Sequence, residues 1–262
     1  MKSLIISADD FGLTDGVCRS VYELLGAGAI SSTSLMLCTK DAINRIKQWH
    51  PKCLLGVAGV HLQLTSGMPL ETTLQGKNCQ FIDPRRKAIF TSTDIETITK
   101  EWQLQINVAC ELLQGMPTHL DSHHGVHRIK EIFPVYKQLA IEHGIPMRGI
   151  YEGELKELIM QNNLPATVAI VRNWTGNSLN SEELLKCLRE IENSHKEENI
   201  IEIITHPGYS DPYLESISSL SRARKNDHNV LLHLAEINCW ENLGFKLASY
   251  KDCFHERILK TC

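Results

Sequence analysis

The sequence lacks any long hydrophobic run. No apolar segment approaches the roughly 18 residues that a membrane-spanning helix needs. The apolar run at 4–8 is too short for the core of a signal peptide, and Asp9 and Asp10 follow it at once. We therefore expect a cytoplasmic protein that does not associate with membranes.

A pattern of paired cysteines is also missing. The nine cysteines of the 262-residue chain are scattered and odd in number, and they form no CxxC motif. Many lie in apolar surroundings, as Cys38 does after the run 35–37. Such a set predicts reduced thiols that pack as small apolar side chains, rather than a disulfide framework.

An excess of positive charge is lacking as well. The formal net charge is −4, so we expect no general electrostatic attraction to nucleic acid. The nearest basic cluster, Arg222, Arg224 and Lys225, is short and is followed by Asp227, which predicts a solvated face. Internal repeats and clear domain boundaries are absent too, and we expect residues 1–262 to form a single domain.

Predicted strands and helices alternate along the chain. The apolar runs that predict strands are Lys2–Ala8, Ser32–Leu37, Leu54–His61, His119–Ser122, Met147–Ile150, Thr167–Val171, Asn199–Thr205 and Phe245–Ala248. The segments with a helical pattern are Gly16–Leu25, Lys40–Gln48, Thr93–Leu113, Ile129–His143, Ser181–Glu192 and Val230–Glu236. Repeated βα units favour parallel strands with right-handed crossovers. This α/β pattern predicts a TIM-like (β/α) barrel, complete or distorted and incomplete, with an open doubly wound sheet as the alternative.

The segment 63–92 has no periodicity and contains several glycines and prolines. Loops of this length in compact domains are usually functional or disordered. Because it directly follows His61, it predicts a loop insertion that covers a substrate, with an ordinary insertion as the alternative.

Ionisable residues stand at the ends of four predicted strands. They are Asp9 and Asp10, His61, the histidines of 118–127, and His206. In an α/β barrel these strand ends meet on one face, where active sites lie. One carboxylate and two imidazoles meeting there would form a three-ligand metal site with room for water. The aspartates could supply a ligand and a base, although a turn with a helix cap also explains them, and His61 alone also fits a core position.

The segment 118–127 contains four histidines and one aspartate within ten residues. Histidine is a common metal ligand, and Asp121 could orient such a ligand. His119 and Asp121 share one strand face, and His123 continues the alternation. The alternative is a solvated polar loop.

Two other residues stand out by their chemistry. His206 is followed by Pro207 and Gly208, which favour a rigid turn, and its imidazole could protonate a leaving group. The guanidinium of Arg148 suits either an anionic ligand or a catalytic carboxylate.

Four segments in this order, 8–12, 59–62, 118–124 and 206–209, resemble motifs of the YdjC-like carbohydrate deacetylase family, which includes chitooligosaccharide deacetylases. Each motif is weak alone, but their order and spacing make the match specific, while beyond about Ser216 it is loose. The resemblance implies a barrel enzyme that hydrolyses a linear amide bond. Its substrate would be a small oligosaccharide containing N-acetylglucosamine, such as diacetylchitobiose or a phosphorylated form, and acetate would be released.

The resemblance also implies one divalent metal ion, held by Asp10, His61 and His123. Magnesium is the ion that it implies first, and zinc or another ion suits the same ligands. It further implies that Asp9 is the general base and His206 the general acid.

Other residues would bind the substrate or support the ligands: Asp121, His124, His127, Arg148 and Tyr209. Tyr209 could pack on a sugar ring or hydrogen-bond to it, and a structural role fits it at least as well. The family's His-His-His-Val-His reads His-His-Gly-Val-His at 123–127, so Gly125 replaces the middle imidazole. The specificity for the sugar or the acyl group could therefore differ.

Two other functions fit the same residues. A phosphoesterase with two metal ions could use His119, His124 and His127 as extra ligands. A catalytically silent sugar-binding protein is the other, and Gly125 is the one hint that favours it. For the oligomeric state, a homodimer is the commonest default.

Overall fold

The structure, a computed structural model, describes residues 1–74, 80–81, 83–87, 89–171, 180–194 and 196–258. Its strands are β1 (Lys2–Phe11), β2 (Ser32–Leu35), β3 (Ala58–Leu62), β4 (Leu120–Ser122), β5 (Met147–Arg148), β6 (Ala166–Thr167), β7 (Ala169–Val171), β8 (Ile200–Thr205) and β9 (Phe245–Leu247). Its α-helices are α1 (Asp15–Gly26), α2 (Ala42–Gln48), α3 (Ser92–Leu113), α4 (Phe133–Glu142), α5 (Gly153–Gln161), α6 (Ser181–Ser194), α7 (Pro212–Ile217), α8 (Ala223–Glu236), α9 (Cys239–Asn242) and α10 (Tyr250–Ile258). Short 3₁₀ helices are η1 (Pro51–Leu54), η2 (Thr72–Leu74), η4 (Pro84–Arg86) and η5 (His123–Arg128).

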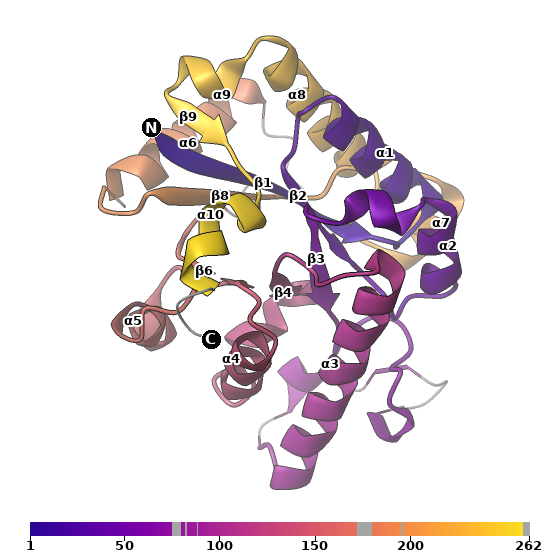
Figure 1. Ribbon diagram of the computed structural model, residues 1–262. Coiled ribbons are helices and arrows are strands. Elements are labelled where there is room, and N and C mark those ends of the chain that lie inside the picture. The colour runs from indigo at the N-terminus through magenta and orange to yellow at the C-terminus, as the bar shows by residue number, and fades with distance from the viewer. Residues whose placement is uncertain (75–79, 82, 88, 172–179, 195, 259–262) are drawn as a thin grey trace.

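The strands form a nearly closed parallel barrel with helices around it (Figure 1). Their neighbour order is β6-β5-β4-β3-β2-β1-β8-β7, with β9 paired to the start of β1. Only Val168 separates β6 from β7, and the two pair with β5 and β8 respectively. One extended segment therefore joins both edges of the sheet. The predicted distorted (β/α) barrel is confirmed, and the open doubly wound sheet is not formed.

The first strand positions the acidic pair. All residues of β1 from Leu4 to Phe11 are buried, as expected for a parallel strand covered on both faces. The strand extends three residues beyond the predicted end at Ala8, and its pairing with β2 is irregular between Ala8 and Phe11. Asp10 lies in this irregularity with a φ of 72°. Such an irregularity re-aims side chains, so neighbouring residues can face the same cavity.

Four α-helices lie where the sequence pattern predicted none. They are α5, α7, α9 and α10, while α8 begins seven residues before the predicted start at Val230. Of α5 only Ile159 is buried, and α7 spans six residues, so neither has a clear apolar period. In the early turns of α8 the buried residues are Arg224, Asp227 and His228, which an apolar pattern cannot reveal.

A buried carboxylate anchors the loop between β3 and α3. Glu101 of α3 accepts the backbone N–H groups of Leu70 at 3.2 Å and Glu71 at 2.5 Å, and the amide of Gln105 at 2.6 Å. The side chain of Gln105 also accepts a hydrogen bond from the Gln63 N–H and donates one to the Gln63 carbonyl. Residues 75–79, 82 and 88 of the predicted loop insertion lie outside the described residues.

The seven described cysteines are free, as expected, and Cys18, Cys38 and Cys239 are buried. Among the described helices, none has both the length and the apolar composition that a membrane span requires.

Candidate active site

Ionisable side chains meet in a cavity of about 580 Å³ at the carboxyl ends of the barrel strands. Its lining includes the five residues expected to bind metal or transfer protons: Asp9, Asp10, His61, His123 and His206. The aspartates come from β1 and His61 from β3, whereas His123 begins η5 directly after β4 and His206 follows β8. The barrel thus brings together residues that are far apart in the sequence.

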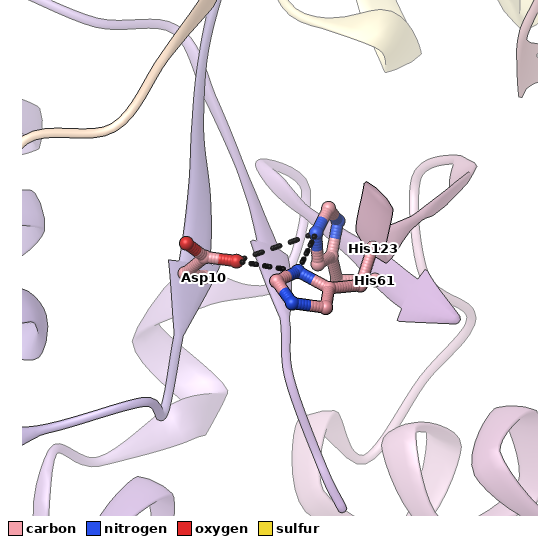
Figure 2. Close-up of side chains that lie close together, drawn as sticks. All are labelled: Asp10, His61 and His123. Atoms are coloured by element: carbon pink, nitrogen blue, oxygen red, sulfur yellow. Dashed lines mark hydrogen bonds and ion pairs between the residues drawn. The ribbon is translucent and has the colours of Figure 1, made fainter. Parts of the chain in front are cut away.

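Asp10, His61 and His123 point at one another (Figure 2). The distances joining Asp10 Oδ1, His61 Nε2 and His123 Nδ1 are all 3.3 Å. Donor atoms about 2.0–2.1 Å from one tetrahedral ion lie about 3.3–3.4 Å apart. Asp10 Oδ1 is buried and has no hydrogen-bond donor among the described residues. One carboxylate and two imidazoles at this spacing therefore fit a divalent metal ion.

The opposite nitrogen of His61 is held by Asp121. Asp121 Oδ1 lies 2.8 Å from His61 Nδ1, and the hydroxyl of Ser34 donates to Asp121 Oδ2 at 2.9 Å. A carboxylate at Nδ1 places the proton there and leaves Nε2 as a lone-pair donor toward Asp10. Burial lowers the pKa of His61, but Asp121 and Asp9 together outweigh it and raise the pKa to about 9, so an ion that binds at Nε2 would displace a proton there.

Asp9 is gripped by a buried arginine. Arg148 Nη1 donates to Asp9 Oδ2 at 2.7 Å, and Nη2 donates to Asp9 Oδ1 at 2.8 Å. The same guanidinium contacts Asp121 at 2.8 Å and Glu202 at 2.8 Å. This two-pronged pairing fixes the carboxylate plane of Asp9 at the cavity wall. The sequence left two partners open for Arg148, an anionic ligand or a carboxylate of the site. The structure shows contact with the carboxylate of Asp9.

Sequence reasoning did not single out Glu202, which is fully buried in β8. Its carboxylate also accepts hydrogen bonds from Thr167 at 2.6 Å and Tyr250 at 2.7 Å. An acidic residue inside an otherwise apolar strand was the available signal, because such a group needs a buried partner.

The other histidines of 118–127 do not belong to the Asp10 cluster, although the His124 ring lies against that of His123, with centroids 3.9 Å apart. His119 stacks on Tyr250 with ring centroids 3.9 Å apart, and it is not among the described residues lining the cavity. His127 contacts the Ser122 hydroxyl at 2.6 Å. Burial is the main cause that lowers the pKa of His119 to about 4 and of His127 to about 3.

His124 and His127 line the cavity, whereas Tyr209 does not belong to its described lining. His124 is exposed, and its Nδ1 lies 2.9 Å from the Thr65 hydroxyl, which links η5 to the loop after β3. The Tyr209 hydroxyl instead donates to Glu23 of α1 at 2.5 Å.

His206 is held by its backbone. Its N–H donates to Asp227 Oδ2 of α8 at 3.1 Å, and its side-chain Nδ1 is buried without a partner among the described residues. Burial is the main cause that lowers the pKa of His206 to about 4, against the charges of Asp10 and Asp9. The imidazole is therefore neutral near pH 7.

The sequence profile of the YdjC-like protein family matches residues 3–236. The chain belongs to the YdjC-like family. It is 30% identical over 259 residues to a chitooligosaccharide deacetylase of Yersinia enterocolitica, covering 96% of this chain and 99% of that protein. It is 32% identical over 256 residues to a carbohydrate deacetylase of Clostridium beijerinckii, covering 95% and 99% respectively.

A solved structure from Enterococcus faecalis V583 shares the fold. It is provisionally named a cellobiose-phosphate cleavage protein and has a TM-score of 0.82 with this chain at 25% identity. The likeness covers 95% of this chain and 98% of that one.

The prediction of a solvated basic face at Arg222, Arg224 and Lys225 is wrong for Arg224. Only 2% of Arg224 is exposed, and its Nη2 donates to Asp10 Oδ2 at 2.6 Å. Burial raises the pKa of Asp10, but the charges of Arg224 and His123 outweigh it and hold the pKa well below its usual range. A sequence signal existed, because Arg224 and Asp227 lie three residues apart and so share one helix face.

Gly125 lies where the first cavity meets a second one of about 540 Å³. Both cavities are lined by His124, Gly125, Arg128 and Tyr151. Gly125 has a φ of 61°, and a Cβ placed on it would lie 2.7 Å from Arg128 Nε. The missing side chain leaves room for Arg128, whose Nη1 donates to the Tyr151 hydroxyl at 2.6 Å. The absence of a side chain at Gly125 therefore shapes the boundary between the two cavities.

Proposed function

We propose that this chain is a metal-dependent deacetylase that removes the N-acetyl group from N-acetylglucosamine-containing oligosaccharides and releases acetate. That it is a carbohydrate deacetylase follows from its family and its named relatives. The metal, the substrate and the residue roles are the proposal. The observation that carries it is the triangle of Asp10, His61 and His123 beside the arginine-held carboxylate of Asp9.

Asp10, His61 and His123 would hold the ion. A divalent ion, when bound, supplies a Lewis acid that polarises the acetamide carbonyl and lowers the pKa of the attacking water. Magnesium prefers oxygen ligands, whereas two imidazoles suit zinc or another transition metal. The donor set therefore favours a transition metal, and reconstitution of the metal-free protein with either ion tests this.

Asp9 and His206 move the protons. Asp9 takes a proton from the attacking water, and Arg148 keeps its carboxylate fixed for that step. His206 gives a proton to the departing amine, which leaves as the free amino sugar while acetate is formed. Because His206 is neutral near pH 7, the proton that it gives to the amine would be the one that Asp9 took from the attacking water, so each turnover returns both groups to their starting state.

The geometry favours one ion over the two that the phosphoesterase alternative needs. A second acidic group, Asp9, His61 and Asp121, also lies close together. Its carboxylates are already engaged, since Arg148 contacts both oxygens of Asp9 and one of Asp121, and His61 contacts the other. We infer that this second group is an internal ion-pair network.

The two adjoining cavities fit an oligosaccharide. Ligand sites commonly measure about 300–1,000 Å³, and each cavity falls in that range. We place the sugar that loses its acetyl group in the first cavity and the next sugar in the second, beside Tyr151. A disaccharide should therefore be a better substrate than N-acetylglucosamine alone.

The decisive experiment measures acetate release from diacetylchitobiose and from its 6-phosphate, with and without chelator. Chelator-sensitive acetate supports the proposal, and the better substrate identifies the preferred form. Metal binding without acetate release would favour the phosphoesterase alternative or another acyl substrate. Absence of both would favour a silent sugar-binding protein.

A further inference from the structure

We propose that Arg224 is a positioning residue that restricts Asp10 to a single oxygen toward the metal ion. This inference rests on the proposed function, because it assumes the ion that Asp10, His61 and His123 would hold. It adds a residue from α8 that the sequence analysis did not assign to the site.

The two oxygens of Asp10 have different surroundings. Arg224 Nη2 donates to Oδ2 at 2.6 Å, and no more than 2% of either residue is exposed. Oδ1 has no hydrogen-bond donor among the described residues and lies 3.3 Å from both imidazole nitrogens. A charge-assisted hydrogen bond at Oδ2 fixes the rotation of the carboxylate. Only Oδ1 is then free to bind a cation.

This arrangement has a consequence for catalysis. A carboxylate that binds through both oxygens occupies two positions around an ion, whereas one oxygen occupies one. Catalytic metal sites keep a position open for water or substrate. By engaging Oδ2, Arg224 preserves that opening, so its role is exerted through Asp10 and not by contact with the substrate.

Arg224 is itself held in place by the loops around the site. Its Nε donates to the Leu220 carbonyl at 2.8 Å, and its own carbonyl accepts the Gly208 N–H at 3.1 Å. A Cβ on Gly208 would lie 3.1 Å from Arg224 Cδ, which is tighter than ordinary contact. The glycine after His206 and Pro207 therefore gives Arg224 the room to reach Asp10.

The test compares Arg224→Met and Arg224→Lys with Arg222→Met as the matched control. Arg222 precedes the same helix, and 87% of its side chain is exposed. Methionine keeps much of the length of arginine without its charge, and lysine keeps the charge without the planar fork. The probes are Zn²⁺ and Co²⁺ alone, with affinity measured by calorimetry and the ligand field by the visible absorption of bound Co²⁺.

We expect Arg224→Met to weaken metal binding about 10–100-fold, as loss of a residue that supports a ligand does. Arg224→Lys should bind more tightly than Arg224→Met yet still show an altered Co²⁺ spectrum. Arg222→Met should match the wild type in both.

A folded Arg224→Met protein with wild-type affinity and spectrum would overturn the proposal. If circular dichroism shows that this variant does not fold, Arg224→Lys is the deciding variant. A wild-type metal affinity and Co²⁺ spectrum in Arg224→Lys would then overturn the proposal. Failure of the proposed function is a different result, namely a wild-type protein that binds neither ion, and it would remove the role of Arg224 too. Normal wild-type binding with unaffected variants removes the role of Arg224 alone.

Discussion

At the scale of single residues, two neighbouring aspartates of the site have different hydrogen-bond partners. Asp9 is gripped on both oxygens by Arg148, while Asp10 is bonded on one oxygen and faces two imidazoles with the other. The same residue type can therefore serve as a base at one position and as a metal ligand at the next.

Asp9→Asn tests the base. The amide keeps the size of the side chain but cannot take a proton from water, so turnover should fall by about 10²–10⁴-fold. Metal affinity should stay near that of the wild type, because the three ligands are untouched. Acetate release and calorimetry measure the two quantities. Asp15→Asn, an exposed change on α1, is the control, and unchanged turnover in Asp9→Asn would remove the assignment.

Asp227 makes stability depend on pH. Burial raises its pKa to about 7, against the His206 N–H and the charge of Arg224. The unfolded chain loses this proton near the usual value of 3.8, so the carboxyl destabilises the fold progressively as pH rises from about 4 to 7. The difference between the two pKa values sets an upper bound of roughly 4 kcal/mol on this destabilisation. The Asp227→Asn variant cannot ionise at this position. Its free energy of unfolding should therefore rise relative to that of the wild type as pH increases over that range.

Urea unfolding of both proteins at pH 5 and pH 8 measures this difference. The buried histidines His119 and His127 also respond to pH, but they are common to both proteins and cancel in the comparison. An equal difference in unfolding free energy at both pH values would show that Asp227 ionises normally.

At the scale of elements, the strands and helices with a clear apolar period could be predicted, and those stabilised by polar contacts could not. The prediction for α3 differs from the helix by one residue, and a capping box of Thr91 and Asp94 marks its start. By contrast, α8 begins with buried Arg224 and Asp227, whose partners come from other elements. Their spacing places both residues on one helix face, but only the folded barrel reveals the partners that they find there.

Glu101 of α3 is the element-scale test, because it anchors the loop after β3. Glu101→Ala removes the acceptor of the Leu70 and Glu71 N–H groups, at a cost of about 1–3 kcal/mol. Local opening should rise accordingly, by about one to two orders of magnitude. Trypsin should then cut faster at Arg85 and Arg86 of the same loop.

The control is Glu96→Ala, which changes an exposed glutamate on the same helix. Equal trypsin rates for both variants and the wild type would show that the loop is held by other contacts.

At the scale of the whole molecule, the barrel concentrates negative charge around one opening. The buried carboxylates Asp9, Asp10, Asp121 and Glu202 outnumber the buried guanidiniums Arg148 and Arg224. An excess of buried negative charge favours a cation. The convergence of strand ends was predictable from the sequence. The closure through Val168 was not, because it depends on which strands the two halves of one segment pair with.

A bound ion should therefore stabilise the entire fold. An ion that binds only the folded state adds about 2.7 kcal/mol at 100 times its Kd. For a chain of this length that corresponds to a Tm rise of roughly 5–10 °C. His123→Asn should lose this rise, whereas His143→Asn should keep it, since His143 lies at the end of α4 and outside the described cavity lining. Thermal unfolding at increasing Zn²⁺ measures both. A full rise in Tm in His123→Asn would mean that the ion is held elsewhere. A stoichiometry of two ions per chain would favour the phosphoesterase alternative.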